Sequence, residues 1–147
     1  MCDEYNILKA LKRIHIEIEN VINHSISKYD LTAAQGDILG YLIRHKDEKI
    51  CSTDIHIKMG ISRASVSATL KKLRNNNFIV FTNVNHDERV KYIELTDKAL
   101  MIEKEIRSCF EKINTIIYND FSENEKAQLT GYMKKMTKNI KNFKQFE

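Results

Sequence analysis

The chain has 147 residues, 42% of them hydrophobic, and a formal net charge of +4. This length suits a single domain with a buried core, and 4 glycines with no proline favour long helices. We find no apolar run long enough to span a membrane and no signal-peptide pattern at the acidic N-terminus, so we expect a cytoplasmic protein. The 3 cysteines are an odd number without paired spacing, which argues against a disulfide framework and a zinc ribbon.

The first third of the chain predicts two helices. Apolar residues at helical spacing predict a long amphipathic helix that ends near Ser27. These residues are Ile7, Leu8, Leu11, Ile14, Ile18, Val21 and Ile22. Thr32 and Gln35 then fit a capping box, in which each side chain satisfies a free backbone N–H. The box predicts a second helix that ends between His45 and Glu48.

A short strand and two shorter helices are expected next. Ile50–Cys51 is apolar and short enough to be a single small strand. Ser52 can cap a helix that ends at Gly60, and Ser62 can cap another helix. The second of these helices carries three apolar residues on one face, Val66, Leu70 and Leu73.

A β-hairpin follows these helices. Residues 78–81 and 92–95 are rich in β-branched and aromatic side chains, which is typical of strands. The polar stretch from Asn83 to Glu88 lies between them and is expected to form the hairpin tip.

Two helices complete the predicted order. Thr96 can cap a long helix that runs to about Asn119, and Ser122 with Glu125 fits a second capping box that opens the last helix. The expected fold is therefore mainly α with a small β-hairpin, which is the pattern of a winged helix-turn-helix.

Residues 52–75 have the spacing of a helix-turn-helix, with Gly60 at a corner that needs a left-handed conformation. The outer face of the second helix is small near its start and basic near its end. Small residues let a helix enter the major groove, hydroxyls bond to base edges or phosphates, and basic residues neutralise phosphates. No acidic residue occurs between Ile55 and His86. We therefore predict double-stranded DNA binding through Ser62, Arg63, Ala64, Ser65, Ser67, Ala68, Lys71, Lys72 and Arg74.

The hairpin supplies a second predicted contact. Arg89 is expected at its tip, where an arginine can enter a narrow minor groove because the potential there is most negative. Asp87 is poorly suited to face phosphate and is expected to orient a basic side chain. Lys91 completes the predicted DNA-binding set of the hairpin.

These motifs resemble the MarR family of bacterial regulators. The resemblance rests on Gly60-Ile61-Ser62, on Ser65-Val66-Ser67 through Leu73, on Asn77-Phe78-Ile79, on Asp87-Glu88-Arg89 and on Leu95-Thr96, and it covers nearly the whole chain. It implies one MarR-type domain over residues 1–147, with a helix-turn-helix at 52–75 and a wing at 78–95 inside a lobe at 32–95. Helices at 5–29 and 97–145 would form a homodimer, and a pseudo-palindromic operator and repression would follow by analogy.

The sequence departs from the family's usual pattern at several positions. Ala68 and Phe81 stand where the family often has arginine, and Asn77 stands where it often has glycine. Asparagine tolerates the left-handed conformation, so the change at Asn77 is mild. The loss of arginine at Ala68 removes an expected DNA contact, so the preferred DNA sequence stays open.

The resemblance also implies a small-molecule effector in a cleft beside the dimerisation helices. His15, Tyr41 and His45 lie in segments that could line such a cleft, although a packing role for Tyr41 and a surface role for the histidines are the simpler interpretations. We expect no metal and no cofactor. Thiol sensing is disfavoured because Cys2 lies in an acidic neighbourhood, which raises rather than lowers a thiol pKa.

Two other functional classes are the alternatives. A winged helix can serve as a protein–protein interaction module, which predicts no salt-dependent duplex binding. An enzyme is disfavoured, because the sequence has no glycine-rich phosphate loop, no HExxH motif and no nucleophile elbow.

Overall fold

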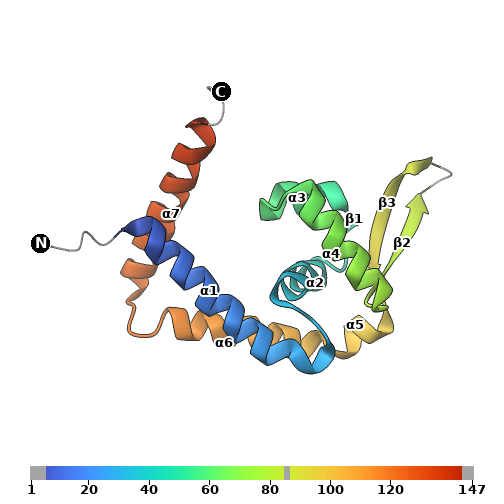
Figure 1. The fold of residues 1–147 in the computed structure, drawn as a ribbon, viewed down its shortest axis with the longest axis horizontal. Helices are drawn as coiled ribbons and strands as arrows, with labels where there is room; N and C mark the ends of the chain where they lie inside the picture. The colour runs from blue at the N-terminus through green and yellow to red at the C-terminus, as the bar shows by residue number, and fades with distance from the viewer. Residues whose placement is uncertain (1–5, 85–86, 144–147) are drawn as a thin grey trace, which may run out of the picture. The chain divides into compact units, whose positions relative to one another are not determined.

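The computed structural model describes residues 6–84 and 87–143, apart from the side chains of Val84, Asp87 and Glu88. The chain divides into two compact units, residues 1–111 and residues 112–147. The first unit, drawn from blue to orange in Figure 1, holds the predicted winged helix-turn-helix. No helix of the described residues is long and apolar enough to cross a membrane.

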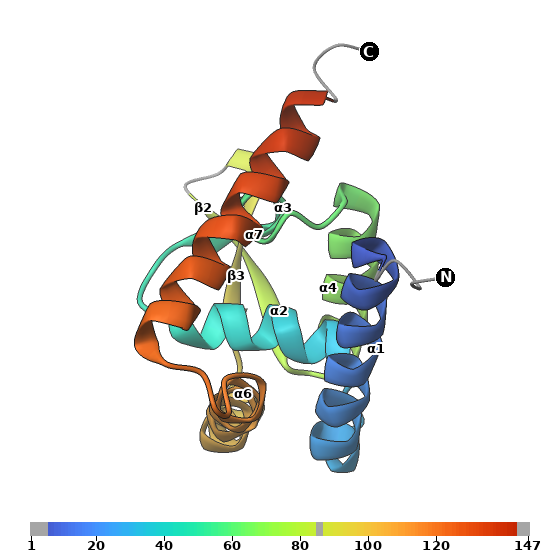
Figure 2. The same cartoon turned by 90° about the vertical axis from the view of Figure 1, so that its left-hand side faces the viewer.

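The first unit opens with two helices that run in clearly different directions (Figure 2). Helix α1 spans Ile7–Ile26 and continues into a short 3-10 turn, Ser27–Tyr29. Helix α2 spans Ala33–Arg44, and the predicted capping box is confirmed. The backbone N–H of Gln35 donates to Thr32 Oγ1 at 3.4 Å, and the N–H of Thr32 donates to Gln35 Oε1 at 3.1 Å.

Glycine at two positions of α2 lets neighbouring helices approach closely. A Cβ at Gly36 would lie 2.6 Å from Ile26 Cδ1 in α1, and a Cβ at Gly40 would lie 2.8 Å from Phe110 Cε2. The isoleucine methyl can move, but the Phe110 ring is flat and rigid, with the Arg44 guanidinium 5.8 Å from its centroid. The Phe110 ring can therefore pack against α2 only because residue 40 is glycine.

Gly40→Ala is expected to lower the free energy of unfolding by about 1–3 kcal/mol, because the added methyl displaces the Phe110 ring. Gly131→Ala is the matched control, since Gly131 lies in the last helix, α7 (Glu123–Phe143), and a methyl added there would have nothing of this chain within 4 Å. The control should be neutral or stabilising by up to about 1 kcal/mol, because alanine favours helix more than glycine does. Urea denaturation midpoints of the two variants measure the difference, and equal midpoints would refute the close approach.

The helix-turn-helix and its sheet follow. Strand β1 is Ile50–Cys51, helix α3 is Ser52–Met59, and helix α4 is Arg63–Asn75. Strands β2 (Ile79–Val84) and β3 (Asp87–Leu95) form the hairpin, and the antiparallel sheet has the order β1-β3-β2. Helix α4 lies between α3 and the hairpin (Figure 1) and contacts α2, α3 and β2.

Two details differ from the sequence prediction in this region. Cys51, not Ser52, is the N-cap of α3, because the Asp54 carboxylate accepts the Cys51 N–H at 2.8 Å and the Cys51 side chain accepts in return from the backbone of Asp54. The hairpin strands also run farther than predicted and include most of the stretch expected as a tip. Only residues 85 and 86 separate them, and these lie outside the described residues.

The predicted long helix after the hairpin is broken in two. Thr96 caps α5, Asp97–Met101, as expected. Ile102 then leaves helical geometry, and α6 begins anew and spans Glu103–Ile117. Ala99, Ile102 and Ile106 are all buried, so the bend lets both segments keep their apolar residues covered.

Helix α7, Glu123–Phe143, begins at the second predicted capping box, which is confirmed. The N–H of Ser122 donates to Glu125 Oε2 at 2.8 Å, and the N–H of Glu125 donates to Ser122 Oγ at 3.3 Å. None of the described residues of α7 is buried. The core of the protein thus lies in the first unit, around α2, α4 and the sheet.

Candidate nucleic-acid interface

The corner of the helix-turn-helix is fixed by a bond that closes α3 and by a contact that crosses the turn. Gly60 ends α3 with φ of 69°, the left-handed conformation that the sequence predicts, and its N–H donates to the carbonyl of His56 at 3.1 Å. His56 Nδ1 lies 2.6 Å from the carbonyl oxygen of Ile61. These bonds hold the start of α4 in place relative to α3.

The N-terminus of α4 is capped as predicted. Ser62 Oγ accepts the N–H of Ser65 at 3.2 Å and donates to Ser65 Oγ at 2.9 Å. Both predicted hydroxyls are therefore ordered by the cap, and the Ser65 hydroxyl keeps its own hydrogen for another acceptor.

Helix α4 buries one face and exposes the other, as its pattern predicts. Val66, Leu70 and Leu73 are at most 2% exposed and pack into the core. All the residues assigned to the DNA-binding face are exposed, namely Ser62, Arg63, Ala64, Ser65, Ser67, Ala68, Lys71, Lys72 and Arg74. The exposed face of α4 thus carries small side chains toward its start and basic side chains toward its end.

The wing residues are placed differently from the prediction. Arg89 lies within β3 rather than in the connecting tip, because pairing of the two strands extends as far as Val84 and Asp87. Arg89 and Lys91 are both exposed. The side chain of Asp87 lies outside the described residues, so its orienting role stays a prediction.

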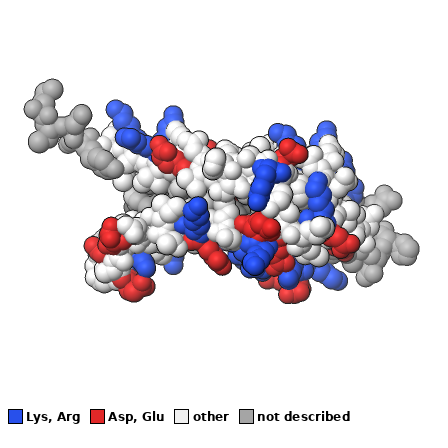
Figure 3. Space-filling view, turned by 90° about the horizontal axis from the view of Figure 1, so that it is seen from below, with Lys and Arg blue, Asp and Glu red and all other residues white. Residues whose placement is uncertain are grey.

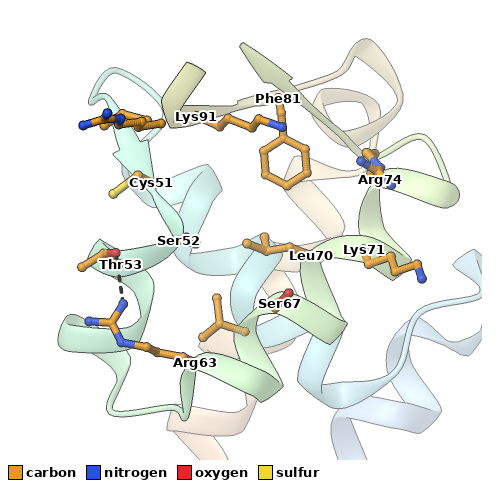
Figure 4. Close-up of a pocket in the computed structure, with 13 residues that line it drawn as sticks. Cys51, Ser52, Thr53, Arg63, Ser67, Leu70, Lys71, Arg74, Phe81 and Lys91 are labelled. Atoms are coloured by element: carbon orange, nitrogen blue, oxygen red, sulfur yellow. Dashed lines mark hydrogen bonds between the residues drawn. The ribbon is translucent and has the colours of Figure 1, made fainter. Parts of the chain in front are cut away.

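A hollow of about 460 Å³ lies between α4 and the wing (Figure 4). Its floor includes the buried Val66 and Leu70 of α4. Of the 13 described residues that line it, five are basic and none is acidic. The basic ones are Arg63, Lys71, Arg74, Arg89 and Lys91. By contrast, basic and acidic side chains are interspersed on the face shown in Figure 3.

Arg63 and Arg74 stand at opposite ends of the hollow, and each has a partner that orients it (Figure 4). Arg63 Nη1 donates to Thr53 Oγ1 at 3.4 Å. The Arg74 guanidinium lies 5.8 Å from the centroid of the Phe81 ring. Sequence reasoning missed both Thr53 and Phe81 as partners, because neither partnership follows from spacing along the chain.

Asp54 follows Ser52 and Thr53, which line the hollow, but its carboxylate is already hydrogen-bonded. Asp54 accepts the backbone N–H of Cys51, and this bond, helped by the Cys51 side chain and nearby Lys58, holds the pKa of its carboxyl below the usual range. Asp54 therefore stays ionised as part of the α3 cap. The sequence could have predicted this cap, because Asp54 is the third residue of α3, the position of the acidic residue in a capping box.

The predicted effector residues are only partly brought together. Tyr41 and His45 stack with ring centroids 4.5 Å apart, and His45 Nδ1 lies 2.8 Å from Glu48 Oε1. His45 lines a second hollow, of about 640 Å³, whose lining includes neither His15 nor Tyr41. His15 is exposed in α1, with Nε2 3.6 Å from Glu19 Oε1.

One carboxyl that interacts with His15, that of Asp37, has an unusual environment. Burial raises the pKa of Asp37 above its ordinary value, and the negative charge of Glu19 adds to the rise, while His15 and Arg44 oppose it. The charge of His15 in α1 thus acts on the Asp37 carboxyl in α2.

The helix-turn-helix and its wing also occur in known proteins. The sequence model of the transcriptional regulators SarA/Rot matches residues 20–106. The chain belongs to the SarA/Rot family of transcriptional regulators. The matched range includes the whole helix-turn-helix, the hairpin and α5.

Curated relatives and solved structures agree with this family. The chain is 27% identical to the HTH-type transcriptional regulator TcaR of Staphylococcus aureus over 119 residues, covering 80% of this chain and 77% of TcaR. It is 25% identical to PecS of Dickeya dadantii over 138 residues, covering 92% of this chain and 82% of PecS. The S. aureus MepR–DNA complex has a TM-score of 0.86 at 24% identity and covers 93% of this chain and 99% of MepR. The expected MarR-type winged-helix fold is confirmed.

Proposed function

We propose that this SarA/Rot-family regulator binds double-stranded DNA with α4 in the major groove and the wing in the adjacent minor groove. The observation that carries the proposal is the hollow between α4 and the wing, where five basic residues gather and where none of the described lining residues is acidic. Clustered basic residues are the electrostatic footprint of a duplex-binding surface. The MepR structure was determined with DNA, which supports the same use of this fold.

The roles within this surface follow from residue type. Ala64, Ser67 and Ala68 are small and exposed, so α4 can approach base edges closely. Ser65, whose hydroxyl keeps its hydrogen, is suited to a phosphate at the start of the helix, and Ser62 holds that hydroxyl in place. The three basic residues of α4 that line the hollow, Arg63, Lys71 and Arg74, are suited to phosphates along its edge. Lys72 lies on the exposed face just outside the hollow and takes the same role.

The wing completes the proposed contact. Arg89 and Lys91 lie two residues apart on β3 and line the hollow opposite α4. A basic side chain carried by a strand can enter the minor groove, where it reads groove width rather than individual bases. Asp87 belongs to the proposed set as a residue that orients one of these side chains.

Lys71→Ala is expected to weaken binding of specific and random duplexes by a similar factor, because a phosphate contact carries no sequence information. The plot of log Kobs against log salt should become shallower by about 0.9 for each phosphate that the protein no longer neutralises. Fluorescence anisotropy titrations at several salt concentrations provide both numbers. A loss confined to one DNA sequence would show instead that Lys71 reads bases.

A homodimer is part of the proposal, within a single MarR-type domain of residues 1–147. Helices 5–29 and 97–145 would form its interface, of which residues 5, 144 and 145 lie outside the described residues. Large apolar side chains are exposed on α1 and α7, including Leu8 at 70%, Tyr132 at 62% and Phe143 at 68%. Exposed apolar stripes of this kind mark protein–protein contacts.

We therefore expect twice the 17.2 kDa chain mass in light scattering at micromolar concentration. A single-chain mass at that concentration would refute the dimer without touching the proposed DNA surface.

The regulator is further proposed to act in the cytoplasm as a ligand-responsive repressor on a pseudo-palindromic operator. A two-fold symmetric dimer matches a two-fold symmetric site. His15, Tyr41 and His45 remain the proposed effector residues. Of these, His15 interacts with the Asp37 carboxyl, whose pKa burial raises.

Selection of bound duplexes from a random pool tests the proposed function directly. A DNA-binding regulator enriches a defined sequence, and binding to it falls steeply as salt rises. The competing function, a protein-interaction module, predicts no enrichment and no salt-dependent duplex binding.

A further inference from the structure

The hollow lies where a strand of the duplex would have to pass. A helix in the major groove and a wing in the adjacent minor groove are separated by one sugar-phosphate backbone. In this protein α4 forms one wall of the hollow and the wing the other (Figure 4). We propose that Phe81 is a positioning residue that holds Arg74 against this backbone, an inference that rests on the proposed DNA-binding function.

Phe81 is placed to do this by the register of the sheet. It lies in β2 opposite Ile93 of β3, whose side chain is buried. Its ring therefore projects from the side of the sheet that covers the core, and it points into the hollow toward α4 (Figure 4). Phe81 is partly exposed, so the ring is accessible to a neighbouring cation.

Arg74 is that cation. It lies in the last turn of α4, and its guanidinium carbon is 5.8 Å from the ring centroid, within the range of a cation–π contact. Within the part of the chain that the structure describes, no carboxylate lies within ion-pair distance of Arg74. Phe81 is thus the contact that the structure gives this guanidinium.

An aromatic partner leaves the guanidinium able to bind phosphate. The ring attracts the charge without accepting a conventional hydrogen bond, so the N–H donors stay available for two phosphate oxygens. A carboxylate partner would occupy those donors and repel the phosphate. Ordering Arg74 before the duplex arrives also lowers the entropy that binding would otherwise cost.

The contact also joins the helix to the wing. Phe81 belongs to β2, which pairs with the strand that carries Arg89 and Lys91, whereas Arg74 belongs to α4. Arg74 of α4 would therefore bind a phosphate in an orientation that Phe81 of the wing sets. If Phe81 only packed in the hollow, its effect on DNA binding would not depend on Arg74. If Phe81 positions Arg74, the effect requires Arg74.

A double-mutant cycle on duplex affinity tests the dependence. Phe81→Leu keeps an apolar side chain in the hollow but removes the ring, and Arg74→Gln removes the charge. Phe81→Leu should weaken duplex binding by about two- to fivefold, the range of an exposed cation–π contact. In the Arg74→Gln background the same substitution should have no further effect, because there is no charge left to position.

Two controls separate positioning from folding. Phe81→Tyr keeps an aromatic ring and should bind within about twofold of the wild type. Arg63→Gln lies at the opposite end of the hollow, with Thr53 as its partner, so the effects of Phe81→Leu and Arg63→Gln should multiply. Urea midpoints for each variant show whether the folded fraction is unchanged.

Equal effects of Phe81→Leu with and without Arg74 would overturn the inference, as would a Phe81→Tyr variant as weak as Phe81→Leu. Either result leaves the proposed DNA binding intact, because the wild-type protein still binds. A wild type that binds no duplex at any salt concentration removes the proposed function, and the inference with it.

Discussion

Ser67→Asp is expected to weaken duplex binding by at least about 100-fold, equivalent to about 3 kcal/mol. Ser67 is exposed on α4, lines the hollow and lies between Arg63 and Arg74 along the helix. A carboxylate at this position faces phosphates at short range, and like charges brought together at an interface cost several kcal/mol. Anisotropy titration at a fixed salt concentration measures the loss.

Ser108→Asp is the matched control for this added negative charge. Ser108 is also an exposed serine in a helix, but it lies in α6 and does not line the hollow. Its effect on duplex affinity should stay within about threefold, provided that light scattering finds an unchanged mass. Equal losses for the two variants would mean that net charge alone, rather than the face of α4, governs binding.

Leu73→Ala is expected to lower the free energy of unfolding by about 2–5 kcal/mol, because it leaves a cavity in a packed core. Leu73 is 0% exposed and lies on the buried face of α4. Thermal or urea unfolding measures the loss. Stability of this size is a large part of what a small domain possesses, so the variant should also lose DNA affinity as it is warmed.

Leu100→Ala provides the comparison for this cavity. Leu100 lies in α5 and is 42% exposed, so its truncation should cost under about 1 kcal/mol. A loss as large as that of Leu73→Ala would contradict the assignment of Leu73 to the core that supports the recognition surface.

Local signals in the sequence predict most of the element order. The pairs Thr32–Gln35 and Ser122–Glu125 fix two helix starts, because each pair satisfies backbone N–H groups that have no other partner. Gly60 at φ of 69° and Asn77 at φ of 61° both adopt the left-handed conformation that their residue types tolerate. These features depend on residues close in the sequence, which is why a single sequence reveals them.

The differences arise where tertiary contacts override local preference. No glycine or proline marks the break at Ile102, so residue propensities predict one continuous helix. The hairpin strands extend into polar residues near their connection. These residues do not alternate between apolar and polar, so the sequence pattern does not predict them as strands. Cys51 caps α3 although sulfur is not a usual cap, since Asp54 supplies the stronger half of that box.

The sequence predicts which side chains of α4 are exposed, but not their partners on other elements. Every residue assigned to the outer face of α4 is exposed, because helical periodicity places it opposite the apolar residues. The partnerships of Arg63 with Thr53 and of Arg74 with Phe81 join residues on different elements. Such contacts appear only after the chain has folded, and they turn a set of basic residues into an ordered surface.

Site-specific photo-crosslinking to a duplex selected from a random pool tests the central claim most directly. A photoreactive side chain would replace Ser67 on α4, Val90 on the wing or Ser108 on α6, in three separate proteins. We expect covalent DNA adducts from positions 67 and 90, which line the hollow, and none above background from position 108. Adducts from position 108 without adducts from 67 and 90 would contradict the claim that α4 and the wing together bind the duplex.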